Sequence, residues 1–199
     1  MGLFVAYFGL EHARPELAHH TIVLGPRYRE LLTDIFDKHV LAEDFSLYRH
    51  APTRTDPSLA PEGKECCYVL APVPNNQGRP LDWAKEGERY RDRIFAALEQ
   101  RGVPGLRKDL ATVKHVTPDH FEKNLLSMHG AGFSIEPTLQ QSAWLRFHNE
   151  SEDVKDLYFV GAGTHPGAGM PGVLCSAKVL DRLIPAVGKA RRLRVVKAA

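Results

Sequence analysis

A glycine-rich stretch near the C-terminal end of the sequence places the strongest constraint on the fold. Residues 157–160 are apolar, aromatic and β-branched, which predicts a buried strand. A glycine-rich loop over 161–172 follows, and then a run over 173–183 with apolar residues at helical spacing. This order exposes backbone N–H groups at the positive end of a helix, because glycine has no Cβ to hold a ligand away. We therefore expect an anionic ligand at this loop.

Three glycines, in the pattern Gly161-x-Gly163-x-x-x-Gly167, resemble the dinucleotide-binding fingerprint that opens a βαβ unit. That fingerprint requires a second strand, which ends in an acidic residue about 20 residues later. Asp181 has nearly this offset, but it lies inside the helical run. The stretch is therefore predicted to be the last strand, loop and helix of a flavin domain whose first part lies elsewhere.

Residues 157–173 also carry a family resemblance. Together with residues 25–28, 41–48, 58–63 and 133–137, they resemble the bacterial and fungal type of phytoene desaturase, FAD-dependent carotenoid enzymes related to the flavin amine oxidases. The resemblance covers nearly the whole chain outside its C-terminal tail. It implies an oxidoreductase of carotenoid biosynthesis, in which FAD accepts hydride from a phytoene-like polyene while a proton is lost. The reduced flavin is then reoxidised by an acceptor such as a quinone.

The resemblance places the cofactor at the glycine loop. Backbone N–H groups of 161–164 would approach the FAD pyrophosphate or ribityl chain, and those at the helix start would face the pyrimidine edge of the flavin, where negative charge develops. The predicted cofactor-binding residues are Gly161, Ala162, Gly163, Thr164, Gly169, Met170, Pro171, Gly172 and Val173. His165, inside the loop, is expected either to contact cofactor or substrate or to have a structural role. The alternative for the whole loop is a glycine-rich turn that binds no ligand.

The rest of the chain predicts an α/β protein of the mixed α+β kind. Strands are expected over 3–10, 21–24, 45–50, 66–73 and 110–116, and helices over 28–37, 83–101 and 118–126. Connections of uneven length favour a mixed or antiparallel sheet with flanking helices. We expect a substrate-binding portion over 1–127, the C-terminal part of an FAD-binding Rossmann-like domain over 128–187, and a basic tail over 188–199.

Composition narrows the possible partners. A net charge of +2 with 25% charged residues gives no indication of a nucleic-acid partner. Three cysteines, two of them adjacent at Cys66 and Cys67, do not form a disulfide framework, so we expect a reducing, cytoplasmic compartment. No run approaches the ~20 apolar residues that span a bilayer. The basic tail is either a solvated terminus or a contact with anionic lipid, and the membrane-resident substrate implied by the resemblance favours peripheral membrane association.

Side chains for metal binding or acid–base chemistry receive no firm assignment. His12, His19 and His20 have no carboxylate or cysteine at ligand spacing, so no metal site is predicted. Asp44 and Glu136 are flanked by apolar residues, and burial would raise the pKa of each carboxyl group. The alternative for both is the cap of a helix or turn. No catalytic residue is assigned.

The N-terminal part of the chain lacks the dinucleotide fingerprint, since Gly2, Gly9 and Gly25 do not form it. We therefore expect a separate N-terminal FAD-binding half as a partner, and an isolated chain that is inactive and binds little FAD. The alternative function is an interaction module that binds a hydrophobic ligand or a partner protein. Five aromatic residues are expected either to line a hydrophobic tunnel or to pack in the core: Phe4, Tyr7, Phe45, Tyr48 and Trp144.

Overall fold

The computed structural model describes residues 1–78, 81–136 and 138–184, and the chain divides into two compact units. The first unit is Met1–Gly132 and the second is Phe133–Ala199. The basic tail predicted over 188–199 lies outside the described residues.

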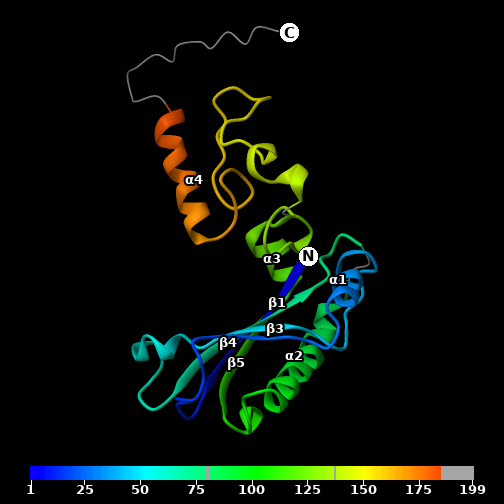
Figure 1. Cartoon of the computed structure of the whole chain (residues 1–199), viewed down its shortest axis with the longest axis vertical. Helices are drawn as coiled ribbons and strands as arrows, with labels where there is room; N and C mark the ends of the chain where they lie inside the picture. Colours follow the sequence, from blue (N-terminus) through cyan, green and yellow to red (C-terminus); the bar gives the residue numbers. More distant parts are fainter. Residues whose placement is uncertain (79–80, 137, 185–199) are drawn as a thin grey trace. The chain divides into compact units, whose positions relative to one another are not determined.

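A five-stranded antiparallel sheet forms the first unit (Figure 1). Its strands are β1 (Gly2–Leu10), β2 (His20–Val23), β3 (Leu47–His50), β4 (Glu65–Val73) and β5 (Leu110–Val116). The strand order is β2-β3-β4-β1-β5, so β1 has hydrogen-bonded partners on both sides. The predicted fold class is confirmed, and the sheet is the antiparallel one of the two predicted kinds.

Helices α1 (Arg29–Phe36), α2 (Trp83–Gln100) and α3 (Pro118–Leu125) accompany the sheet. The long helix α2 begins where the sequence predicts, because the Asp82 side chain accepts a hydrogen bond from the Lys85 N–H at 3.2 Å. It ends just before Gly102, which has a φ of +134°. Local capping signals therefore fix both ends of this helix.

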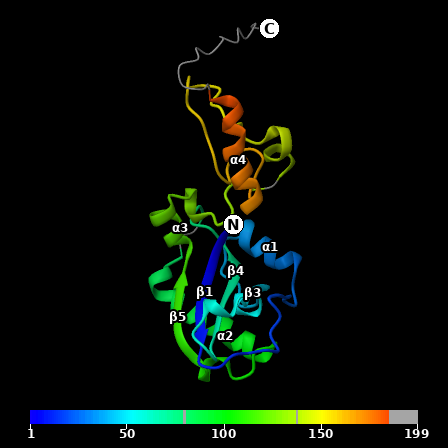
Figure 2. The same ribbon diagram turned by 90° about the vertical axis from the view of Figure 1, so that its left-hand side faces the viewer.

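The core of the first unit lies between one face of the sheet and α2, which runs along that face in both ribbon views (Figure 1 and Figure 2). Burial alternates along β4, as expected for a strand with one covered face. Aromatic rings join the two layers: the ring centroids of Phe4 and Tyr90 are 5.1 Å apart, and those of Phe8 and Phe95 are 5.3 Å apart. Burial of each such side chain stabilises the fold by about 1.5–3 kcal/mol.

The opposite face of the sheet also carries apolar and aromatic side chains. Its members in strands β1 to β4 include Tyr7, Ile22, Tyr48, Tyr68 and Leu70, which cross-strand pairing places on one side. We call these five residues the open face. Ile22 is 71% exposed and Tyr7 is 47% exposed, so α2 does not cover them.

The second unit contains helix α4 (Met170–Leu183) and short 3-10 turns. The strand predicted over 157–160 is not formed as a regular strand: Tyr158 pairs with Glu150 in an isolated bridge. The pairing does not extend beyond this bridge. The next carbonyl group that could accept from the predicted strand is that of Phe147, and it accepts from the His165 N–H instead, at 2.9 Å. The segment therefore leads directly into the glycine loop.

Candidate functional site

The nine predicted cofactor-binding residues lie in one loop and in the first turn of α4. Gly169 is the N-cap residue of the helix, and Met170 is its first residue. The helix thus starts three residues before the predicted position, because proline is well suited to the first turn and Pro171 continues the helix. Gly169 has a φ of +91°, a conformation that favours glycine.

Several backbone N–H groups of the loop are available to a ligand. Within the described residues, the N–H groups of Ala162, Gly163 and Thr164 have no hydrogen-bond partner. The same holds for the N–H groups of Met170 and Gly172 in the first turn of α4. Unpaired N–H groups at a helix start form a site that favours anions.

Other predicted positions are used inside the fold. The Gly161 N–H donates to Ser176 Oγ at 2.8 Å, and the Val173 N–H donates to the Gly169 carbonyl at 2.9 Å. The Thr164 side chain is buried, and its hydroxyl contacts the carbonyl oxygens of Phe147 and His148 at 2.8 and 3.0 Å. These three residues shape the loop through contacts within the chain.

Gly172 allows the loop to close against the helix. A Cβ atom at this position would lie 2.5 Å from the Gly167 carbonyl oxygen, which is too close for any other residue. A Cβ atom at Gly169 would meet nothing within 4 Å, so the space beside the helix start is open. The loop is therefore closely packed where Gly172 meets Gly167, and it is accessible at Gly169.

A buried arginine forms hydrogen bonds to backbone carbonyl groups of the glycine loop. Arg146 is 7% exposed, and its guanidinium donates to the carbonyl oxygens of Thr164, at 3.1 Å, and of Ala162. Its third contact, to the Gln141 carbonyl oxygen, is 3.4 Å long. These bonds turn the carbonyl groups of the loop inward, which leaves the N–H groups on the opposite side.

Two further buried polar side chains complete this support. The Asn149 amide donates to the carbonyl oxygens of Phe159 and His165 at 3.1 and 2.9 Å. Ser176, which is fully buried, accepts from Gly161 and donates to the Val173 carbonyl oxygen at 2.6 Å. We call Arg146, Asn149, Thr164 and Ser176 the polar scaffold. Of these four residues only Thr164 was predicted as a site residue, since long-range contacts to backbone carbonyl groups leave no pattern in a sequence.

A hollow of about 800 Å³ borders the glycine loop within the second unit. Apolar side chains, including Trp144, Phe147, Phe159 and Val160, contribute most of its surface, and the polar and acidic residues 150–153 also line it. Gly163 and Thr164 form part of its wall. The loop thus lies between a mainly apolar hollow and an open helix start.

The candidate acid–base residues behave differently from their prediction. A hydrogen bond from Arg27 lowers the pKa of Asp44, with Arg27 Nε 2.8 Å from Asp44 Oδ2, so the pKa expected to rise is in fact lowered. Glu136 is exposed, so the condition of burial is not met for this carboxylate. His165 takes part in the loop through its backbone, which donates to Phe147 and accepts from Asn149.

The structure also brings His50 next to His19 and His20, a neighbour that the sequence did not indicate. His19, His20 and His50 offer ring nitrogens that all lie within 4.8 Å of one another. His50 belongs to β3, and the register of β3 against β2 places it opposite His20. That register cannot be read from the spacing of residues along the chain.

No family model matches this chain. Among curated proteins, it is 59% identical over 182 residues to the phytoene desaturase (lycopene-forming) of Pantoea ananas, and 58% identical over 182 residues to that of Pseudescherichia vulneris. Each alignment covers 92% of this chain and 37% of the relative. The phytoene desaturase (neurosporene-forming) of Cereibacter sphaeroides is 50% identical over 196 residues, with 96% of this chain and 38% of the relative covered.

The chain thus spans little more than a third of the length of the curated relatives it matches. Relatives with different named products, lycopene and neurosporene, align with nearly all of it. This chain is similar in sequence to the C-terminal portion of the bacterial phytoene desaturases.

Proposed function

We propose that this chain acts as the C-terminal part of an FAD-dependent carotenoid desaturase that introduces double bonds into a phytoene-like polyene. The observation that carries the proposal is its 59% identity, over 182 residues, to a protein named as a lycopene-forming phytoene desaturase. The relatives are longer, and a partner segment equivalent to their N-terminal part would supply the dinucleotide fingerprint.

The glycine loop suits the cofactor. FAD would lie against the unpaired N–H groups of residues 162–164 and of Met170 and Gly172, and when bound it would supply the hydride acceptor. The N–H groups at the start of α4 favour negative charge on a group placed before them. The apolar side chains of the hollow beside Gly163 provide a surface on which a flat ring system can pack.

The open face of the first unit suits a polyene. Tyr7, Ile22, Tyr48, Tyr68 and Leu70 form a continuous apolar and aromatic surface on strands β1 to β4. Phe4 and Phe45 belong to the core instead, since they are 0% and 4% exposed. We assign substrate binding to the portion over 1–127 and completion of the flavin domain to the portion over 128–187.

A chimera tests the proposed activity. This chain would replace the matching C-terminal portion of the Pantoea ananas enzyme, and the chimera would be expressed in cells that make phytoene. We expect a flavin-containing protein and a coloured desaturated carotenoid, measured by absorbance after chromatography. A chimera that contains flavin but leaves phytoene unchanged would contradict the proposal.

Met170 offers a matched test of the cofactor position, because it is 80% exposed at the start of α4. In the chimera, Met170→Asp adds a negative charge next to the unpaired N–H groups, while Met170→Asn adds a side chain of the same shape without the charge. We expect the aspartate variant to lose flavin and the asparagine variant to retain most of it. Equal flavin content in both variants would place the cofactor elsewhere.

The chain alone should bind little FAD, since the loop offers only part of the contacts that such a large cofactor needs. Absorbance of bound flavin after gel filtration measures this directly. A stoichiometric yellow protein would show that the chain is sufficient for FAD binding, and would contradict the need for a partner segment.

We also propose peripheral membrane association, because a polyene substrate resides in the bilayer. None of the described helices is long and apolar enough to cross a membrane. Co-sedimentation with anionic and neutral liposomes is expected to weaken in high salt but to persist, since apolar contact remains when charge is screened. A chain that fails to sediment under any of these conditions would favour the interaction-module alternative.

A further inference from the structure

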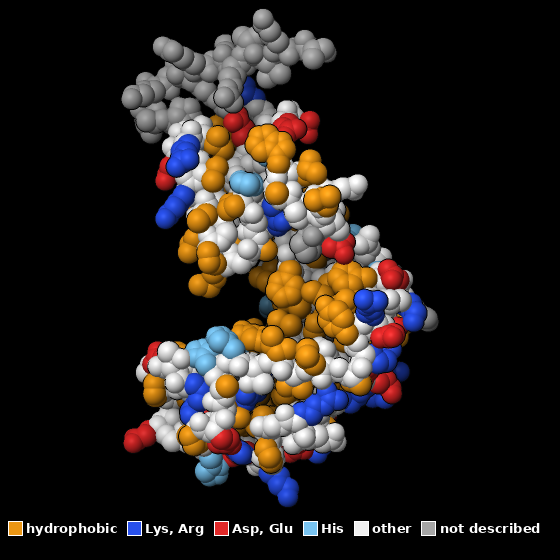
Figure 3. Space-filling view, viewed as in Figure 1, with side chains coloured by type: hydrophobic (Ala, Val, Ile, Leu, Met, Phe, Trp, Pro, Cys, Tyr) orange, Lys and Arg blue, Asp and Glu red, His pale blue; other side chains and the backbone are white. Residues whose placement is uncertain are grey.

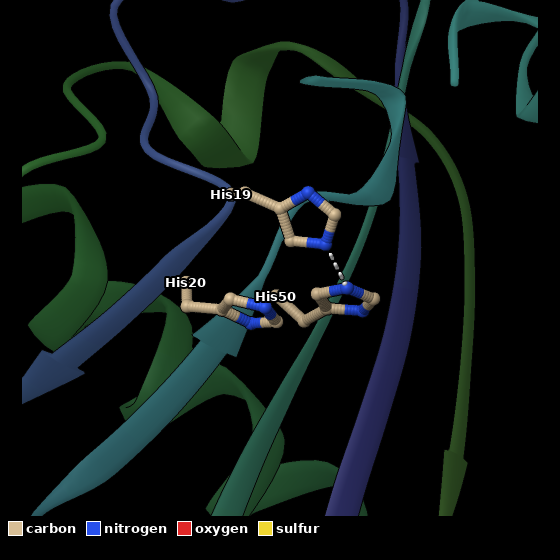
Figure 4. Close-up of side chains that lie close together, drawn as sticks. All are labelled: His19, His20 and His50. Carbon is tan, nitrogen blue, oxygen red and sulfur yellow. Dashed lines mark hydrogen bonds between the residues drawn. The ribbon is translucent and has the colours of Figure 1, made fainter. Parts of the chain in front are cut away.

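Three histidines meet at the edge of the sheet in the first unit (Figure 4). His19 directly precedes β2, His20 is the first residue of β2, and His50 is the last residue of β3. The register pairs His20 with His50, and the two rings stack with centroids 5.0 Å apart. His19 Nε2 lies 2.7 Å from His50 Nε2, so these two nitrogens point at each other.

Hydroxyl groups hold the other ring nitrogens of two of these histidines. The Nδ1 atom of His19 contacts the Thr55 hydroxyl, and the Nδ1 atom of His20 lies 2.7 Å from the Tyr48 hydroxyl. Metal-binding histidines characteristically use one nitrogen for the ion and fix the ring through a hydrogen bond at the other. The arrangement therefore leaves Nε2 of His19 and of His20 for a ligand.

The contact between His19 and His50 fits a shared ligand. Their Nε2 atoms lie 2.7 Å apart, so they either share a proton or, after a small separation of the two rings, hold a cation between them. A proton satisfies two nitrogens, whereas a cation can also engage the third ring.

We propose that His19, His20 and His50 bind one divalent transition-metal cation, represented by Zn²⁺, through their imidazole nitrogens. Imidazole suits zinc and copper, whereas calcium and magnesium require oxygen ligands. A water molecule would complete four-coordinate geometry. The three ligands lie beside the open face, at the His20–His50 end of β2 and β3, since His20 contacts the Tyr48 hydroxyl and the His50 ring packs 4.9 Å from the Tyr68 ring.

A modest side-chain adjustment suffices for binding. Zinc–nitrogen bonds of 2.0–2.1 Å at a tetrahedral angle place two ligand nitrogens about 3.4 Å apart, so the His19 and His50 rings must separate slightly. His20 is exposed and His19 is half-buried, which leaves room for both rings to turn. The bound ion would tie the edge strand β2, which has one neighbour, to the end of β3.

Calorimetric titration of the full chain with ZnCl2 at pH 7.5, without chelator, tests the site. We expect one Zn²⁺ per chain in the wild type and at least a hundredfold weaker binding in His20→Ala and His50→Ala. His120→Ala is the matched control, because His120 lies on α3 and pairs with Asn124. Tyr48→Phe removes only the hydroxyl and should weaken binding by about ten- to hundredfold.

A Co²⁺ spectrum gives a second, independent measurement of the site. The visible spectrum of bound Co²⁺ should show a four-coordinate site in the wild type and should be lost in His20→Ala. Because the His20 ring is exposed, its removal should leave the fold intact, so misfolding would not explain that loss. A wild-type chain that binds no Zn²⁺ would overturn the proposal. So would equal binding by the His20→Ala and His120→Ala variants, since binding would then be distributed over surface histidines.

Discussion

The interior of each unit is stabilised by a different kind of contact. In the first unit, aromatic and aliphatic side chains are fully buried between the sheet and α2. In the described part of the second unit, the buried side chains are those of the polar scaffold, Arg146, Asn149, Thr164 and Ser176, and no large hydrophobic side chain is buried. The space-filling view shows apolar side chains at the surface of the second unit (Figure 3).

The first unit has an apolar core of its own, whereas the second unit has a glycine loop whose shape depends on hydrogen bonds from buried polar side chains. The first unit gains stability from removing apolar surface from water. The second unit is organised by side chains that bond to backbone carbonyl groups, while Trp144 is 79% exposed and Met170 is 80% exposed. Exposed apolar surface of this kind marks an interaction site, which agrees with our proposal that further protein and cofactor pack here.

The largest expected effect tests the apolar core. Phe95 is 1% exposed, and Phe95→Ala should destabilise the first unit by about 3–5 kcal/mol because a cavity replaces the ring. Trp144→Ala should change stability by less than about 0.5 kcal/mol. Urea unfolding measures both, followed by Trp83 fluorescence for the first unit and by circular dichroism for the variant that lacks Trp144. If Phe95→Ala prevents folding, Phe95→Leu provides the milder comparison, and equal stability of all variants would contradict the contrast.

A second prediction concerns the polar scaffold. Arg146→Ala leaves the carbonyl groups of Ala162 and Thr164 without their donor, and should lower local stability of the loop by about 2–3 kcal/mol. Hydrogen exchange should accelerate at the hydrogen-bonded N–H groups of Gly161 and His165 and stay unchanged in α2. Arg146→Lys retains the charge but not the forked geometry, so it should give an intermediate result. Unchanged exchange in Arg146→Ala would mean that the loop holds its shape without this residue.

A smaller effect is expected for Ser176, whose hydroxyl accepts from Gly161. Ser176→Ala removes that acceptor and should cost about 1–2 kcal/mol. Its neighbour Cys175 is exposed on the same helix, and Cys175→Ala should stay within about 0.5 kcal/mol. Thermal unfolding of the second unit, followed by Trp144 fluorescence, distinguishes the two variants. Equal effects would show that the buried hydroxyl contributes nothing specific.

The smallest effect is a pH dependence in the first unit. The hydrogen bond from Arg27 lowers the pKa of Asp44, so the folded state favours the charged carboxylate. The resulting stability is present above the unfolded pKa of about 4 and is lost as pH falls through the folded value. Asp44→Asn should therefore flatten the acid side of the stability curve and leave the alkaline side unchanged. An unaltered acid limb would exclude the Asp44–Arg27 pair as a contributor.

Local signals in the sequence were sufficient for most of the first unit. The cap at Asp82, the stop at Gly102 and the apolar spacing between them specify α2, because each acts over a few residues. The alternation along β4 likewise predicts a strand with one buried face. Glycine spacing located the loop before α4, although the helix begins earlier, at Met170.

Contacts between distant residues account for what the sequence analysis missed. The segment over 157–160 has strand composition, yet the carbonyl that would extend its ladder pairs with His165 instead. Arg27, seventeen positions before Asp44, reverses the expected pKa shift of that carboxyl group. His50 joins His19 and His20 only through the β2–β3 register. None of these pairings is encoded in the residues next to each position.

The position of β1 inside the sheet has a consequence for how the first unit forms. Val5 of β1 pairs with Leu70 of β4 and with Val116 of β5, so both neighbours of this strand lie far along the chain. Pairing of distant segments first loses the conformational entropy of a long loop, and stabilising contacts form only afterwards, which slows folding. Until β4 and β5 arrive, the apolar strand β1 presents two unpaired edges that can bind another chain. Refolding yield should therefore depend strongly on protein concentration, with aggregation competing against closure of the sheet.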